Sequence, residues 1–133
     1  MHYTKNSVLQ EKSFVFVKTV VNQVREIQSK HKEFVLSKQL LRSGTAVGAL
    51  VSEAEFGQSR ADFIHKMSIA LKEANETKYW LKLLHETKYI DKPIFDSVLN
   101  DCTEIIKMLV SSINTLKKNL EKESVLVKND SFQ

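Results

Sequence analysis

The sequence predicts an all-α protein, and three observations support that fold class. Only three glycines and one proline occur in 133 residues, far fewer than turn-rich β architectures use. Apolar residues recur at intervals of three and four along four long segments, as on one face of a helix. The connections between these segments are a few residues long, which makes neighbouring helices antiparallel. We therefore expect one domain, residues 1–133, folded as an up-down-up-down four-helix bundle.

The first helix is expected over residues 8–31. Ser7, followed by Gln10 three residues later, fits a capping box at its N-terminus. The run FVFV could form a strand if taken alone, but the longer spacing favours a helix. Phe14, Val17, Val21 and Val24 trace one apolar stripe on it, with Phe16, Val20 and Ile27 beside that stripe.

The second and third helices are expected over residues 34–56 and 60–88. Gly57 is well placed as the C-terminal cap of the second helix. Ser59, with Asp62 three residues later, is well placed as the N-cap of the third. The third helix has the clearest periodicity, an a/d seam with small residues in its middle. This seam consists of Phe63, Met67, Ala70, Ala74, Thr77, Leu81 and Leu84.

The fourth helix is expected over residues 92–122. Asp91 can cap it, and Pro93 falls in its first turn, where the missing N–H costs little. The apolar pattern fades after Lys122, so residues 123–133 are expected to form a frayed tail.

Two glycines lie four residues apart inside the second predicted helix, where each costs about 0.5–1 kcal/mol relative to alanine. Gly44 and Gly48 share one face of that helix and leave it bare. Ala70 and Ala74 give the third helix a small centre of its own, so close packing of the two backbones could recover the loss. The bare face could instead pack against another subunit, and the sequence leaves both alternatives open.

Three glutamates near the predicted centre of the bundle, Glu53, Glu73 and Glu76, are the candidate catalytic groups. A buried, unpaired carboxylate has a raised pKa, as general acid–base catalysis often requires. The expected alternative is a structural role in ion pairs. The basic residues available as partners are Arg42, Lys66 and Lys72. No glycine-rich phosphate loop or nucleophile–base arrangement stands out, so no enzyme activity is expected.

A metal site is not expected either. Di-metal helical bundles use Glu-x-x-His on two helices and further glutamates on two more. Among the four histidines, only His65 follows an acidic residue, Asp62, at this spacing, and the motif has no second copy. The sequence therefore predicts no metal and no other cofactor.

Basic residues cluster on the first two predicted helices. Lys18 and Arg25 lie seven residues apart on the first, and Lys38 and Arg42 lie four apart on the second. The whole chain carries a net charge of +4, and the basic excess lies in the first three helices. Such clusters often mark only a solvated face, but a basic surface also attracts nucleic-acid phosphates. An RNP-type aromatic motif is absent, so RNA binding here would depend on charge and shape.

The stretch LLRSGTAVGALVSEAE, followed by SRADFIHKMSIALKEANETKYWLKLL, resembles the four-helix bundle family also called 23S rRNA intervening-sequence proteins. The resemblance covers residues 12–116. It departs at Leu50, where the family usually has asparagine after the GA pair. The resemblance implies a bundle that assembles into a ring, commonly a pentamer. The fold is also similar to the accessory protein of diversity-generating retroelements, a basic pentameric barrel that works with a reverse transcriptase and its RNA.

The cysteine content, the N-terminal residues and the length of the apolar runs together predict the cellular location. The lone cysteine, Cys102, fits a reducing cytoplasm. The N-terminal residues are too polar for a signal peptide, and no apolar run approaches the ~20 residues of a membrane span. We therefore expect a cytoplasmic protein without membrane contact.

Two functional hypotheses follow. The leading one is a non-enzymatic homo-oligomer that binds structured RNA or a ribonucleoprotein partner electrostatically, through Lys18, Arg25, Lys38 and Arg42. The alternative is a protein-interaction scaffold without direct nucleic-acid affinity. In both, Trp80 is expected at a helix or subunit interface rather than in base stacking.

Overall fold

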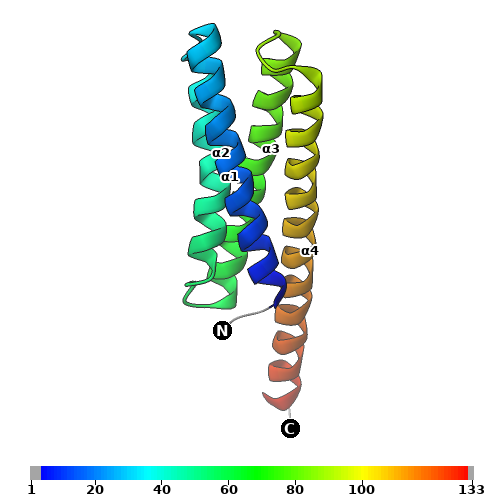
Figure 1. Ribbon diagram of the computed structural model, residues 1–133. Coiled ribbons are helices and arrows are strands. Elements are labelled where there is room, and N and C mark those ends of the chain that lie inside the picture. Colours follow the sequence, from blue (N-terminus) through cyan, green and yellow to red (C-terminus); the bar gives the residue numbers. More distant parts are fainter. Residues whose placement is uncertain (1–3, 132–133) are drawn as a thin grey trace.

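Four α-helices and short connections make up the described chain, in a computed structural model that covers residues 4–131 (Figure 1). The helices are α1 (Thr4–His31), α2 (Leu36–Ala54), α3 (Arg60–Glu86) and α4 (Lys92–Ser131). The predicted all-α, four-helix fold class is confirmed over these residues.

The helices form one bundle in which each runs antiparallel to the next (Figure 1). α1 packs against α2 and α4, and α3 packs against the same two helices. The interface between α1 and α4 is the least extensive of the four. The bundle is therefore most weakly closed along the seam where its first and last helices meet.

The core is apolar and continuous along the bundle. Each helix contributes buried side chains at helical spacing, such as Phe16 of α1 and Leu40 of α2. On α3, the predicted a/d seam is buried from Met67 to Leu84, and Phe63 at its start is half-buried. The 3–4 periodicity therefore predicted the core-facing side of α3 correctly.

The first two helices begin at positions that differ from the predicted ones. α1 is already helical at Thr4, so Ser7 lies inside the helix and does not begin it. α2 begins at Leu36 because the Glu33 carboxylate accepts the backbone N–H groups of Leu36 at 2.9 Å and Ser37 at 2.8 Å. These hydrogen bonds satisfy amides that have no partner within the helix, and they fix its start.

The turn between α2 and α3 confirms one predicted cap and corrects another. The Ser59 hydroxyl accepts the N–H of Asp62 at 3.1 Å and caps α3 as predicted. Gly57 lacks the positive φ of a helix-ending glycine, so its predicted role as a C-terminal cap is wrong. Instead, a Cβ at Gly57 would lie 3.1 Å from the Ala54 carbonyl oxygen, so the missing side chain lets the turn close.

The end of α4 also differs from the prediction. The helix continues to Ser131, where the fading pattern predicts a frayed tail from residue 123. No glycine or proline follows Pro93, and the added residues include good helix formers, so nothing stops the helix. We call residues 118–131 the α4 tail; Leu120 still packs against the core, but the end of the helix extends beyond the other helices (Figure 1), and residues 121–129 are all exposed.

Candidate nucleic-acid interface

The basic residues singled out from the sequence lie on α1 and α2, two helices that pack against each other. They are Lys18 and Arg25 on α1 and Lys38 and Arg42 on α2, all exposed. The Gln28 side chain lies 3.2 Å from the Ser37 hydroxyl and joins the end of α1 to the start of α2. Arg25 and Lys38 flank this contact, so they lie near the same end of the bundle.

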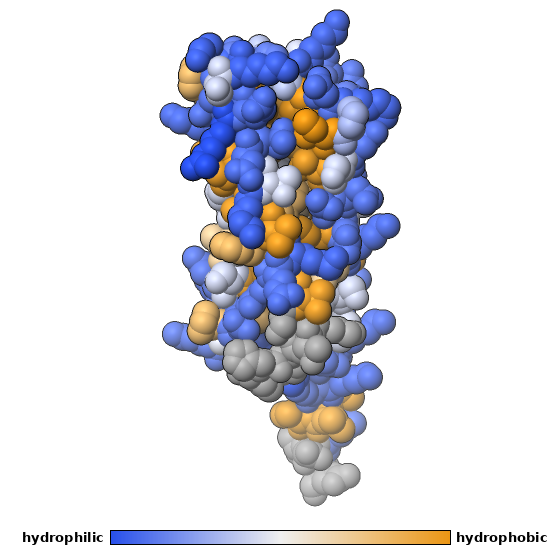
Figure 2. Space-filling model, in the orientation of Figure 1, coloured by the Kyte–Doolittle hydropathy of each residue, from blue (hydrophilic) through white to orange (hydrophobic). Residues whose placement is uncertain are grey.

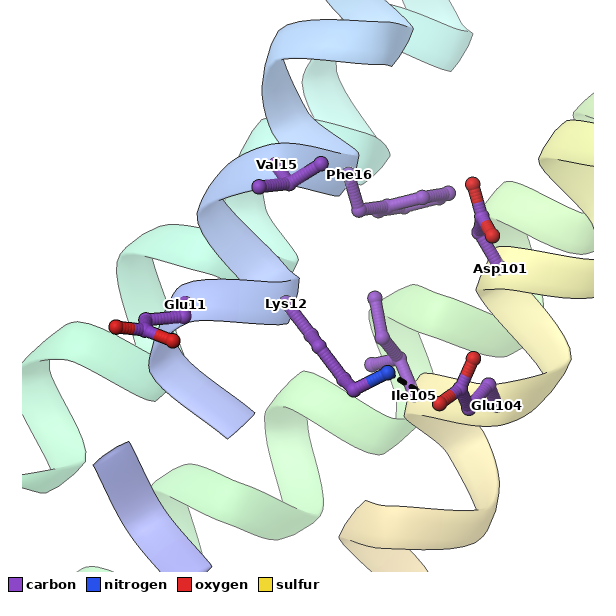
Figure 3. A pocket seen from close by; sticks show the side chains of 7 residues that line it. All are labelled: Glu11, Lys12, Val15, Phe16, Asp101, Glu104 and Ile105. Atoms are coloured by element: carbon purple, nitrogen blue, oxygen red, sulfur yellow. Dashed lines mark hydrogen bonds and ion pairs between the residues drawn. The ribbon is translucent and has the colours of Figure 1, made fainter. Parts of the chain in front are cut away.

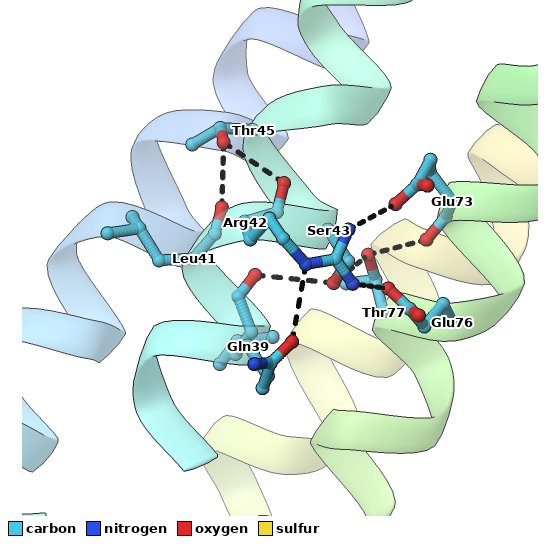
Figure 4. A network of polar contacts seen from close by, with 9 residues as sticks. Gln39, Leu41, Arg42, Ser43, Thr45, Glu73, Glu76 and Thr77 are labelled. Carbon is cyan, nitrogen blue, oxygen red and sulfur yellow. Dashed lines mark hydrogen bonds and ion pairs between the residues drawn. The ribbon is translucent and has the colours of Figure 1, made fainter. Parts of the chain in front are cut away.

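Arg42 is held by α3 and by its own helix (Figure 4). Its guanidinium donates to the Glu73 carboxylate at 3.2 Å, forms a second ion pair with Glu76, and donates to the Gln39 side chain at 3.2 Å. The hydrogen bond to Glu76 is the main cause of the raised pKa of Arg42. Two carboxylates around one guanidinium leave the cluster with a net negative charge, which makes Arg42 a poor ligand for phosphate.

The other three cations are more available. The Lys18 ammonium lies 5.4 Å from the centroid of the Phe14 ring, a cation–π contact that leaves the charge at the surface. Within the described chain, no carboxylate forms an ion pair with Lys18, Arg25 or Lys38. These three residues are therefore the free positive charges of the predicted set.

The three candidate carboxylates all have basic partners. Glu73 and Glu76 share Arg42, and the Glu53 carboxylate lies 3.7 Å from the Lys66 ammonium. The side chain of Glu53 is 60% exposed, so its environment is largely aqueous. None of the three is both buried and unpaired, so the geometry favours the structural role in ion pairs over the catalytic one.

A buried hydroxyl pair that the apolar pattern did not predict links α2 to α3 (Figure 4). The Ser43 and Thr77 hydroxyl oxygens are hydrogen-bonded at 2.9 Å, and both residues are fully buried. The Thr77 hydroxyl also lies 2.8 Å from the Glu73 carbonyl oxygen. A threonine on an otherwise apolar a/d seam was the available signal, because a buried hydroxyl needs a partner.

The two α2 glycines pack within the chain, against a helix other than the predicted one. A Cβ at Gly44 would lie 2.8 Å from Val20 of α1, and a Cβ at Gly48 would lie 2.6 Å from Val17. The predicted contact with the small centre of α3 is therefore wrong. Successive helical residues differ in direction by about 100°, so Ser43 faces α3 while the glycine beside it faces α1.

The small centre of α3 has a different neighbour. Ala70 and Ala74 are fully buried, and the Cys102 sulfur of α4 lies 3.4 Å from the Ala74 carbonyl oxygen. Trp80 is half-buried, and its ring makes an edge contact with Tyr79 at 5.0 Å between centroids. The small side chains of Ala70 and Ala74 thus allow α3 to pack closely against α4.

The part of the chain that the structure describes contains neither a metal-binding cluster nor a membrane-spanning helix. Residues 4–131 contain no group of three or more histidine, cysteine, aspartate or glutamate side chains placed to hold a metal ion. Asp62 of the predicted Asp62–His65 pair instead accepts the backbone N–H of Gln58 at 3.3 Å. No helix in this part of the chain is long and apolar enough to cross a membrane.

Comparison with known proteins identifies the same family that the sequence motifs resemble. The sequence matches the family described as 23S rRNA-intervening sequence protein over residues 5–111. The chain belongs to this family. Among curated proteins, none matches the sequence.

A related crystal structure supports the family assignment of this intervening-sequence protein. It is described as a protein of unknown function from the S23 ribosomal protein family of Bacteroides thetaiotaomicron. It is 53% identical, with a TM-score of 0.82, and the match covers 84% of this chain and 99% of that one. Neither description names an enzyme activity.

Proposed function

We propose that this intervening-sequence protein is a non-enzymatic, cytoplasmic homo-oligomer that binds structured RNA through the outer faces of α1 and α2. The observation that carries the proposal is the set of three exposed cations, Lys18, Arg25 and Lys38, without carboxylate partners among the described residues. The family description, which concerns 23S rRNA, makes RNA the natural polyanion.

The expected mode of binding is electrostatic. Lysine and arginine side chains displace counterions from phosphates, and this gain is independent of base sequence. The cations project from rigid helices, so they can match the spacing of a folded RNA backbone better than a loop could. Arg42 contributes little in this account, because Glu73 and Glu76 already neutralise it.

Assembly of several copies into one particle strengthens electrostatic binding to RNA. Each copy carries a net charge of +4, and several copies in a ring, such as the pentamer that the family resemblance implies, concentrate that charge on one particle. Several weak contacts on one RNA then combine into a higher avidity.

Charge reversal on the proposed face tests this function. The double variant Arg25→Glu/Lys38→Glu should lose at least about tenfold in affinity for a labelled structured RNA at low salt, measured by fluorescence anisotropy. The matched control is Lys72→Glu/Lys107→Glu, which makes the same charge change at exposed positions of α3 and α4. Equal losses in both variants would mean that the α1/α2 face is not the site.

A protein-interaction scaffold is the second candidate function. It is favoured by large apolar side chains that lie open to solvent, among them Phe34 at 53%, Val35 at 74% and Phe56 at 80% exposure. Such residues are frequent in protein interfaces. Co-purification of protein partners that persists after RNase treatment, together with no RNA binding by the pure protein, would favour the scaffold.

A further inference from the structure

Two connections between helices, α1 to α2 and α3 to α4, lie at the same end of the bundle (Figure 1). The rings of His31 and Tyr89 join them in an edge contact, with 5.3 Å between the ring centroids. We call residues 30–38 and 87–91 together the connection end. Lys38 of the proposed RNA-binding face belongs to it, so the connection end continues that face onto the end of the bundle.

The α1–α2 part of the connection end is basic. Residues 30–38 contain three lysines and one glutamate. Among the described residues, no carboxylate forms an ion pair with any of these lysines. The glutamate, Glu33, is already engaged, because its carboxylate accepts three backbone N–H groups at the start of α2 at 2.8 to 3.0 Å. The lysine charges are therefore available to an anionic partner.

Two lysines of the connection end have a backbone conformation that favours glycine. Lys32 has a φ of 54° and Lys88 a φ of 71°, and both side chains are exposed. Glycine adopts this conformation without steric cost and is the usual residue at such helix ends. A lysine here complements the negative end of the helix dipole. A charged residue kept in a strained conformation is also typical of functional sites.

An aromatic ring lies open to solvent beside these charges. Phe34 is exposed and follows Lys32 by two residues. Figure 2 shows mainly hydrophilic side chains, in blue, over this end of the bundle on the face in view. An open ring among lysines suits an unpaired nucleotide, because the base can stack on the ring while the cations hold the phosphates.

The opposite end of the bundle has an open ring without the basic surroundings. Phe56 lies in the turn between α2 and α3 and is more exposed than Phe34. Residues 53–62, which include this turn, contain three acidic residues and one arginine. Such a surface repels phosphate. The charge around the two rings therefore selects Phe34, and not Phe56, as a nucleotide contact.

We infer that the connection end binds an unpaired nucleotide of the RNA, with the base stacked on Phe34 and the phosphates against Lys32 and Lys88. Every base has a π-face, so this contact favours single-stranded segments without reading their sequence. The inference rests on the RNA binding of the proposed function and adds a structural feature to that RNA, an unpaired segment beside a paired one.

Two labelled RNAs test the stacking by fluorescence anisotropy. One is a blunt duplex, and the other is the same duplex with a single-stranded extension of a few nucleotides. The wild type should bind the extended RNA at least about fivefold more tightly. Phe34→Leu keeps an apolar side chain but removes the π-face, so it should lose most of this preference, whereas Phe34→Tyr should retain it. The matched control, Phe56→Leu, should bind both RNAs as the wild type does.

Glycine at the two strained positions separates binding from helix stability. Lys32→Gly/Lys88→Gly relaxes the backbone, so its melting temperature should equal or exceed that of the wild type. Its affinity for the extended RNA should nevertheless fall at least about threefold at low salt. Lys72→Gln/Lys107→Gln removes the same charge at exposed positions of α3 and α4 and should keep most of its affinity. A glycine variant that melts lower and binds like the wild type would overturn the role of these lysines in binding.

The outcomes distinguish the inference from the function on which it rests. If wild type and Phe34→Leu bind each RNA equally well, the stacking is overturned and electrostatic binding stands. Equal losses by Phe34→Leu on both RNAs would also overturn the stacking, because the ring would then not contact the unpaired base. A wild-type protein that binds neither RNA at low salt would overturn both the inference and the proposed function.

Discussion

Gly48 allows α2 to pack closely against α1, because a side chain there would meet Val17. A Cβ at this position would lie 2.6 Å from Val17 Cγ2, closer than side chains tolerate. Valine has one strongly preferred rotamer in a helix, so it cannot easily turn away. The helix-propensity cost of the glycine is thus offset by the close contact of two helices.

Gly48→Leu should therefore destabilise the protein, by about 1–3 kcal/mol in the free energy of unfolding from overpacking. Urea unfolding followed by circular dichroism measures the change. Ala49→Leu is the matched control, since Ala49 is exposed and should tolerate the same side chain. If both variants unfold at the same urea concentration, the close contact at Gly48 does not exist.

The buried Ser43–Thr77 pair makes a second prediction at the residue scale. Thr77→Val removes one hydroxyl and leaves that of Ser43 with only a 3.4 Å contact to the Leu40 carbonyl oxygen. This should cost about 1–3 kcal/mol. Ser43→Ala should cost less in the Thr77→Val background than in the wild type, because it then removes a hydroxyl that has already lost its partner. Full additivity in this double-mutant cycle would contradict the hydrogen bond.

Helix positions and helix ends are determined by different physical effects. The 3–4 periodicity predicted all four helices, because an apolar stripe reflects burial along many residues. Single hydrogen bonds decide the ends. The sequence pattern did not reveal that Glu33 caps α2, since glutamate is not among the usual N-cap residues.

Glu33 also makes the stability of α2 depend on pH. Slight burial opposes ionisation, but hydrogen bonds from the backbone N–H groups of Leu36, Ser37 and Val35 lower the pKa of Glu33 overall. A lowered pKa stabilises the fold above the pKa of the unfolded chain, about 4.3, and this contribution is lost as pH falls through the folded value. Glu33→Gln should thus cost about 0.5–2 kcal/mol at pH 7 and nearly nothing at pH 2. Thermal unfolding of the wild type and Glu33→Gln at both pH values measures this cost. If the two proteins differ in stability by the same amount at pH 7 and at pH 2, the cap does not depend on charge.

At the scale of the whole molecule, the sequence predicted the architecture better than the site. The basic clusters were visible in the sequence, but the sequence did not show which of their cations would be neutralised by carboxylates of another helix. Arg42 looks equivalent to Lys38 on a helical wheel, yet only Arg42 meets carboxylates from α3. The hollow between α1 and α4, which Lys12 and Glu104 help to line (Figure 3), was not visible in the sequence either, because it depends on how these two helices pack.

The central claim is that an assembled, positively charged bundle binds RNA through its phosphates. Anisotropy titration of a structured RNA across a salt series, with the mass of the same sample measured by light scattering, tests it most directly. We predict an oligomer whose log affinity falls linearly with log salt concentration, with a slope that corresponds to several phosphate contacts. An oligomer that fails to bind RNA even at low salt would contradict the claim.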